Sequence, residues 1–237
     1  KILPTPDRSV EVIRAYLAQP DHRDPAEIIA SGNPTRLTAC MLAAAIGDHK
    51  YIDDHVTAEN TSILEETDYF GKTALMHAVF HRQLECITKL LEKGAMVDTR
   101  HPRSQCTALM LAASNGAYDS VRVLVESGAN IDAISTAGLF GHHRKGYHEC
   151  AKVLCELGAD VNIRQPLDGA TVVISPLSEA VHYNNVELVL LLCRYKAKVD
   201  VLHINKMTAL MQAVNSSQKN LPCVHALLEN GANPMLA

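Results

Sequence analysis

Apolar residues recur every three to four positions over short stretches of the chain, and polar residues fill the positions between them. Two such stretches share one spacing and lie 34 residues apart: Ile87, Leu90 and Leu91, then Val121, Leu124 and Val125. This spacing predicts amphipathic helices. Each stretch is followed by a glycine, Gly94 or Gly128, at the point where a helix must end with a positive φ. The pattern therefore predicts short helices that end in glycine turns.

A second motif precedes these helices and repeats in the same register. The sequence Thr-Ala-Leu-Met occurs at Thr73–Met76, Thr107–Met110 and Thr208–Met211, with related copies at Thr38–Met41 and Ser175–Ser178. The Gly-Ala pair after the second helix recurs at Gly94, Gly128, Gly158 and Gly231. Thr or Ser at the first position can cap a helix that Ala or Pro begins. Two motifs in phase at about 33 residues predict an array of helical repeats.

In these motifs the chain resembles the ankyrin repeat family, whose unit reads roughly G-x-T-P-L-H-x-A-A, then a Leu-rich helix and G-A-D-V-N. The resemblance covers about residues 34–237. It implies an all-α fold, a solenoid of stacked helix–turn–helix units with projecting β-hairpin loops. The expected units are about 34–67, 68–101, 102–133, 134–163, 164–203 and 204–237. Residues 1–33, with an amphipathic helix over Asp7–Leu17, are expected to form a helical cap over the first unit.

Four departures from the family pattern set some units apart. The second helix of the first unit, over Tyr51–Leu64, is acidic and expected to be irregular. In the fourth unit Ser135–Gly141 replaces the first helix, so either the hairpin is short or residues are missing between Asp132 and Gly141. In the fifth unit Gln165–Val173 lengthens the hairpin. Met replaces the family's His in most units, which should remove a Thr–His hydrogen bond and soften the packing.

Composition and charge restrict the class of partner. The chain has 22 Lys and Arg against 26 Asp and Glu, for a net charge of −4. Residues 1–70 hold 6 of these cations and 12 of the acids. No strongly basic face is expected, which argues against nucleic acid. No apolar run approaches the roughly 20 residues that span a bilayer, so no membrane insertion is expected.

The cysteines and histidines give no pattern of a reactive or metal-binding site. Seven cysteines without paired spacing indicate reduced thiols and an intracellular protein of the cytoplasm or nucleus. Cys86, Cys150 and Cys223 share one position of the second helix and are expected in the core. Twelve histidines show no zinc-ligand spacing, and the adjacent His142 and His143 would make a poor chelate. We therefore expect no enzyme activity, no cofactor and no bound metal.

The resemblance implies that partners bind on the concave face formed by hairpins and first helices. The variable positions there that are free of packing duty are the predicted partner-binding residues: Tyr69, Phe70, His77, Phe80, His81, Arg100, His101, Arg103, Leu111, Ser114, Asn115, Arg164, Gln165, Glu179, His182, Tyr183, His203, Asn205 and Gln212. Aromatic rings beside Arg and His are side chains that anchor protein interfaces. The basic residues Arg100, Arg103 and Arg164 favour an acidic segment of the partner.

Three functions remain open from the sequence. The first is a monomeric scaffold that binds a protein or peptide. The second is the substrate-recruiting or regulatory array of a larger enzyme, such as a ubiquitin ligase, a kinase or a secreted effector. The third is a small-molecule or metal-binding protein. The resemblance also marks Asn162 as a possible hydroxylation site, although the sequence favours a structural role for it in the hairpin turn.

Overall fold

The computed structural model describes residues 36–132, 147–162, 165–166, 173–202, 206–216 and 220–236. The expected cap over residues 1–33 and the altered stretch 133–146 lie outside the described residues. Contacts divide the chain into two units, residues 1–112 with 123–129, and residues 113–122 with 130–237. Two helices, α7 (Ala108–Ser114) and α8 (Tyr118–Glu126), contribute residues to both units.

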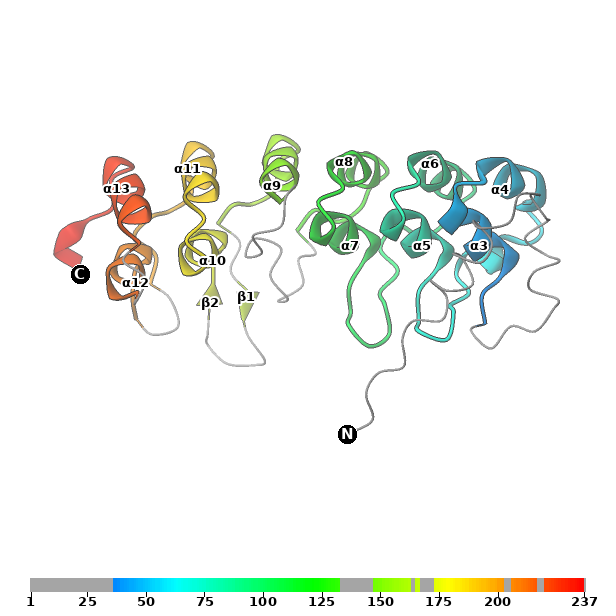
Figure 1. Cartoon of the computed structure of the whole chain (residues 1–237), viewed down its shortest axis with the longest axis horizontal. Coiled ribbons are helices and arrows are strands. Elements are labelled where there is room, and N and C mark those ends of the chain that lie inside the picture. Colours follow the sequence, from blue (N-terminus) through cyan, green and yellow to red (C-terminus); the bar gives the residue numbers. More distant parts are fainter. Residues whose placement is uncertain are drawn as a thin grey trace. The chain divides into compact units, whose positions relative to one another are not determined.

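The first unit contains two helix pairs. These are α3 (Ala39–Ile46) with α4 (His49–His55), and α5 (Ala74–Phe80) with α6 (Leu84–Glu92). In Figure 1, α3 packs against α5 and α4 against α6, so first helices form one row and second helices another. The core between them is closed by small and aliphatic side chains, among them Met41, Leu42, Ile52, Ile87 and Leu90, all fully buried. The loops before α5 and α7 project beyond the first helices, away from the second helices (Figure 1).

The second unit repeats this arrangement. Its helices are α9 (Tyr147–Glu156), α10 (Pro176–His182), α11 (Val186–Arg194), α12 (Ala209–Asn215) and α13 (Leu221–Glu229), followed by the 3-10 turn η2 (Pro234–Leu236). Helix α10 packs on α12, and α11 packs on α9 and α13. The short strands β1 (Gln165–Pro166) and β2 (Val173–Ile174) pair antiparallel, which fits the hairpin expected in the fifth unit.

Side-chain caps begin the first helices as the repeat motif predicts. The Oγ1 atoms of Thr38, Thr73 and Thr208 each accept a hydrogen bond from the backbone N–H three residues on. Ser175 does the same for α10, which begins at Pro176. The glycines that end the second helices have φ between 87° and 95°, also as predicted. The described helices are thus set largely by local sequence.

Two further expectations can be compared with the structure: the loss of the Thr–His hydrogen bond and the irregular second helix of the first unit. The Thr–His bond is replaced rather than simply lost, because the Sδ of Met110 accepts the N–H of Thr107 at 3.4 Å and that of Met211 accepts from Thr208 at 3.3 Å. Sulfur is a weak acceptor, so the cap is weaker than one with His. The irregular second helix of the first unit is confirmed, since α4 ends at His55 and a 3-10 turn, η1 (Thr61–Leu64), follows.

Candidate functional site

Residues 68–72, which we call the first finger, form a turn around a buried carboxylate. Asp68 is 3% exposed, and its Oδ1 accepts hydrogen bonds from the backbone N–H of Phe70 at 2.9 Å and of Lys72 at 2.8 Å. The backbone N–H of Asp68 donates to the carbonyl of Lys72 at 3.0 Å and closes the turn. Gly71 has a φ of 90°, which this turn requires and which favours glycine. The finger therefore has one well-defined conformation.

Helix α5 holds the first finger through the side chain of His77. The Nε2 of His77 lies 3.1 Å from the Oδ2 of Asp68. Because a carboxylate only accepts, Nε2 carries the proton and donates. Burial alone would raise the pKa of Asp68, but hydrogen bonds from His77 and the backbone of Lys72, with the charges of both residues, hold it below its ordinary value of 3.8. Asp68 is thus a carboxylate that the fold keeps ionised.

The position of His77 corrects one predicted partner-binding residue. Its repeat register resembles that of Leu111, Glu179 and Gln212, which are all half-buried, but His77 is only 1% exposed. The side chain is covered because it bonds to Asp68 under the first finger. It offers no surface to a partner, so its predicted contact with one is wrong.

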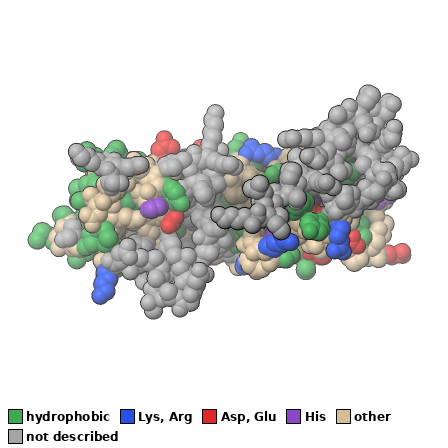
Figure 2. Space-filling model, turned by 60° about the horizontal axis from the view of Figure 1, so that its bottom comes forward, with side chains coloured by type: hydrophobic (Ala, Val, Ile, Leu, Met, Phe, Trp, Pro, Cys, Tyr) green, Lys and Arg blue, Asp and Glu red, His purple; other side chains and the backbone are tan. Residues whose placement is uncertain are grey.

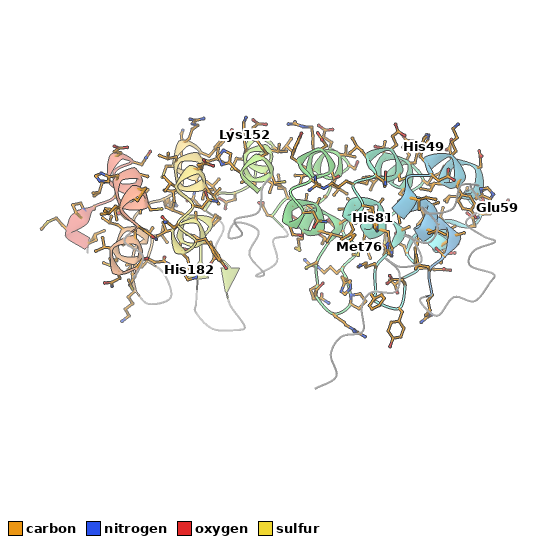
Figure 3. All side chains as sticks on the ribbon, viewed as in Figure 1. His49, Glu59, Met76, His81, Lys152 and His182 are labelled. Carbon is orange, nitrogen blue, oxygen red and sulfur yellow. The ribbon has the colours of Figure 1, made fainter. Side chains whose placement is uncertain are left out.

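Two exposed aromatic side chains lie on the elements that Asp68 and His77 join, one on the first finger and one at the end of α5. Tyr69 is 60% exposed at the first finger and Phe80 is 40% exposed at the end of α5. Tyr69 packs edge-on against Phe70 at 5.5 Å between ring centroids, and Phe80 packs edge-on against His81 at 5.2 Å. The ammonium of Lys72 lies 4.8 Å from the centre of the Phe80 ring, a cation–π contact that ties finger to helix. Figure 3 shows His81 at the end of α5 on the side where the fingers project.

Residues 99–106, which we call the second finger, lie against the first. The Nδ1 of His101 accepts from the backbone N–H of Arg103 at 3.3 Å and of Ser104 at 3.1 Å, which shapes the tip. A Cβ on Gly71 would come within 2.8 Å of the Cδ of Pro102, so the two fingers approach closely there. Arg100 donates from Nη1 to the carbonyl of Gln105 at 3.0 Å, and both Arg100 and Arg103 are exposed.

Together these residues form one candidate surface, which we call the finger surface. It consists of Tyr69, Phe70, Lys72, Phe80, His81, Arg100, His101 and Arg103. Lys72 lies over the Phe80 ring, and Arg100 and Arg103 are exposed on the second finger, whereas the carboxylate of Asp68 is buried. Figure 2, in which the finger side comes forward, shows Lys and Arg side chains beside hydrophobic ones, with Asp and Glu side chains among them. The surface is aromatic with a basic margin.

The remaining predicted residues lie elsewhere or outside the described part of the chain. Leu111, Ser114 and Asn115 on or just after α7 are half-buried. In the second unit His182 is exposed and packs edge-on against the half-buried Tyr183 at 5.0 Å, at the end of α10 (Figure 3), while Glu179 and Gln212 are half-buried. Arg164, His203 and Asn205 lie outside the described residues, as does the side chain of Gln165.

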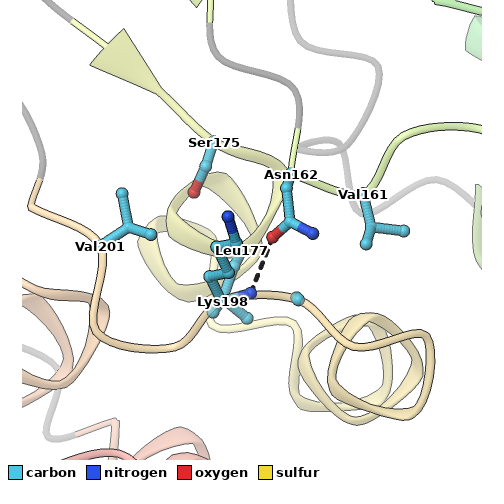
Figure 4. A pocket seen from close by; sticks show the side chains of 7 residues that line it. Val161, Asn162, Ser175, Leu177, Lys198 and Val201 are labelled. Carbon is cyan, nitrogen blue, oxygen red and sulfur yellow. Dashed lines mark hydrogen bonds between the residues drawn. The ribbon is translucent and has the colours of Figure 1, made fainter.

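Asn162 links two successive turns of the second unit. Its Oδ1 accepts from the backbone N–H of Lys198 at 2.7 Å, and its Nδ2 donates to the carbonyl of Lys196 at 3.3 Å. The structural role that the sequence favoured is confirmed by these two bonds, whereas hydroxylation stays a prediction. Beside Asn162, between Val161 and Val201, lies a cavity of about 30 Å³ (Figure 4). Such a cavity holds water rather than a cofactor.

The cysteines of the second helices behave as core residues. Cys86, Cys150 and Cys223 are at most 2% exposed, as their shared register predicted. Burial raises the pKa of Cys40 and of Cys86 to about 12, with smaller contributions from nearby acids. A nucleophilic cysteine needs the opposite shift.

Across the described ranges no three His, Cys, Asp or Glu side chains are placed to hold a metal ion. Each described helix is too short or too polar to cross a membrane.

Three residues that carry the finger surface were not among the predicted ones. Asp68, Gly71 and Lys72 occur in the spacing Asp-x-x-Gly-Lys-Thr just before α5. An Asp that precedes a Gly by three positions is a signal for a turn capped by the Asp side chain. The cation–π contact of Lys72 has no comparable sequence signal, since it depends on where the end of α5 lies.

Comparisons with known proteins agree with this architecture. A family model for ankyrin repeats matches three times, over residues 9–101, 40–135 and 144–237. Human Inversin is 28% identical over 197 residues, which cover 81% of this chain and 18% of Inversin. The glycerophosphocholine phosphodiesterase gde1 of Schizosaccharomyces pombe is 31% identical over 129 residues, or 54% of this chain and 11% of gde1.

A solved structure shows the same fold. The ankyrin repeat domain of Bcl-3, a member of the IkappaB protein family, matches with a TM-score of 0.66 at 23% identity, covering 95% of this chain and 99% of that domain. The chain thus covers nearly all of that solved domain but less than a fifth of the curated relatives Inversin and gde1.

Proposed function

The chain belongs to the ankyrin repeat family, and from this premise we propose that it binds a partner protein or peptide on the finger surface. Ankyrin repeats are in general modules for protein–protein interaction. The observation that carries the proposal is the pair of exposed rings, Tyr69 and Phe80, each braced by a neighbouring ring. Rigid exposed aromatic side chains bind at small entropic cost and dominate the energy of many interfaces.

The partner segment that fits this surface best is acidic. Lys72, Arg100 and Arg103 are the Lys and Arg residues of the two fingers, and the single acid within residues 68–72 and 99–106 is the buried Asp68. The ionised Asp68 lies beneath the surface and is already paired with His77. Complementary charge speeds association and selects among partners. We therefore expect a segment with Asp or Glu beside an apolar or aromatic side chain that contacts Tyr69 and Phe80.

The binding role is proposed as non-catalytic and monomeric, in the cytoplasm or nucleus. The buried thiols with raised pKa and the water-sized cavity at Asn162 support a domain without chemistry of its own. The alternative is an array that recruits substrates for, or regulates, a larger enzyme. In its favour, the relative gde1 is named as a phosphodiesterase, and this chain covers 11% of it. In both cases the finger surface would bind protein.

Capture followed by measured affinity tests the aromatic part of the surface. Proteins retained by the chain would be identified, and each would then be titrated by calorimetry against Tyr69→Ala and Phe80→Ala. We expect each substitution to weaken binding by about 30-fold, as for a central interface residue. Tyr118→Ala is the matched control, because Tyr118 is 47% exposed on α8, outside the fingers. Equal affinity of all three variants and the native chain would refute the finger surface as the binding site.

Charge reversal tests the acidic partner. The variant Arg100→Glu with Arg103→Glu should weaken binding and flatten the dependence of Kd on salt, since two attractive charges become repulsive. Lys152→Glu with Arg194→Glu is the control, because both of these cations are exposed on second helices, α9 and α11. An unchanged salt dependence in the finger variant would contradict an acidic partner while leaving the aromatic contact intact.

A further inference from the structure

We infer that Asp68 and His77 are positioning residues, which hold the first finger in the conformation that presents Tyr69 to a partner. The inference rests on the function proposed above and assigns the control of that surface to a buried pair. The Asp68 side chain is 0% exposed and that of His77 is 1% exposed, with 3.1 Å between Oδ2 and Nε2. Neither residue can touch a partner directly, so each acts through the finger.

The Asp68 carboxylate joins the finger to helix α5. Its Oδ1 holds the backbone N–H groups of Phe70 and Lys72, the residues on both sides of Gly71, while its Oδ2 faces His77. A change on α5 at His77 therefore reaches the finger through a single side chain. If the Nε2–H were removed, a buried carboxylate oxygen would lose its partner, and the carboxylate would gain by moving toward water. That movement would release the two N–H groups and loosen Tyr69.

The pair is a special feature of this repeat rather than part of the scaffold. The residues that take the place of His77 in the other described first helices are Leu42, Leu111, Glu179 and Gln212. Leucine at two of these positions shows that a first helix forms without histidine there. In addition, the Nδ1 of His77 is buried and has no hydrogen-bond partner. A polar ring kept in the core at that cost is explained by the one bond it makes to Asp68.

Amide hydrogen exchange on the free chain tests the inference without a partner. In His77→Leu the amides of Phe70 and Lys72 should exchange about tenfold faster than in the native chain, because the carboxylate that protects them is released. The amide of His81, which donates to the carbonyl of His77 at the C-terminal end of α5, should keep its native rate. His77→Gln retains an N–H donor and should restore part of the protection. Glu179→Leu, at the same register in α10, is the matched control and should leave both finger amides unchanged.

The outcomes separate this inference from the proposed function. Native exchange at Phe70 and Lys72 in His77→Leu would overturn the positioning role, and so would an equal acceleration at His81, which would show general loss of the helix. With an identified partner, His77→Leu should weaken binding by about tenfold, but it should add little to Tyr69→Ala in the double variant, because it acts through Tyr69. Faster finger exchange with unchanged affinity would confirm the positioning role and refute binding at the first finger.

Discussion

Two turns of this chain use the same chemistry in different surroundings. In the first finger the Oδ1 of Asp68 accepts two backbone N–H groups of its own turn and is buried. In the turn over residues 160–162 of the second unit, the Oδ1 of Asp160 accepts the N–H of Asn162 at 2.8 Å, and the Oδ1 of Asn162 accepts that of Lys198 in the next turn. Asp160 is exposed and Asn162 half-buried. One turn is closed on itself, and the other is a link between repeats.

The difference lies in what each kind of turn joins: the first finger is held by its own helix, whereas the turns of the second unit are joined to one another. The linking bonds recur along the second unit, since the Oδ1 of Asp132 accepts from Asp160 at 3.1 Å and that of Asp200 accepts from Asn233 at 3.0 Å. Each such bond is close to water and contributes modestly. The first finger instead depends on the buried carboxylate of Asp68, which has three hydrogen-bond partners. Its conformation is therefore more rigid, and loss of the carboxylate should lower the free energy of unfolding by more. A stiff finger suits a binding surface, and modest repeated links suit a stack.

The largest expected effect comes from removing the buried carboxylate. Asp68→Ala leaves the N–H groups of Phe70 and Lys72 and the Nε2–H of His77 without their acceptor. Loss of one member of a buried pair costs about 3–5 kcal/mol, so the free energy of unfolding should fall by about that amount in urea titrations. Asp54→Ala on α4 is the control, because Asp54 is exposed and surface substitutions change stability by about 0.5 kcal/mol or less. Equal stability of the two variants would contradict the role given to Asp68.

A smaller effect should distinguish Gly71 of the first finger from Gly158, which lies between α9 and the linking turn. Gly71 and Gly158 have φ of 90° and 92°, yet a Cβ on Gly71 would lie 2.8 Å from Pro102, whereas one on Gly158 would meet nothing within 4 Å. Gly158→Ala should cost about 1 kcal/mol of backbone strain. Gly71→Ala should cost about 2–3 kcal/mol, because the fingers must also move apart. Thermal unfolding of both variants measures the difference, and equal costs would show that the fingers are not in close contact.

The sequence predicted what is local and missed what depends on packing. Thr-Ala-Leu-Met and Gly-Ala motifs identified the described helices, their caps and their glycine turns, because each signal lies within a few residues of the structure it determines. The register of His77 suggested an exposed side chain, since it matches Leu111 and Gln212. Burial of His77 follows from the finger that folds over it and from the carboxylate nine residues before it. Likewise, no period in the sequence places Lys72 over Phe80.

The linking turn should respond less than the finger to loss of its side chain. Asn162→Ala removes the acceptor for Lys198 and the donor to Lys196, two bonds close to water, and should cost about 1 kcal/mol. Asn162→Asp keeps the acceptor and reproduces the residue found at Asp132 and Asp200, so its unfolding midpoint should stay close to that of the native chain. Denaturant titration of the pair provides the measurement. A loss above about 3 kcal/mol in Asn162→Ala would place this turn in the same class as the first finger and remove the distinction.

The smallest effect on the free energy of unfolding should come from lowering the pH. Protonation of Asp68 removes only the part of its contribution that depends on its charge. The folded-state pKa of Asp68 lies below its ordinary value of 3.8, through the hydrogen bond and charge of His77 and the backbone of Lys72, against the opposing effect of burial. A lowered folded pKa adds stability that is fully present above the unfolded pKa and is lost as pH falls through the folded one. The native chain should therefore be more stable than Asp68→Asn at higher pH and lose this difference only below about pH 4. Titratable groups that both proteins share affect both equally and cancel in the difference. Urea titrations of the two proteins between pH 6 and pH 2 measure this difference. A stability difference that stays constant over that range would mean that the finger is held by the shape of Asp68 rather than by its charge, as the uncharged side chain of Asn162 holds its link.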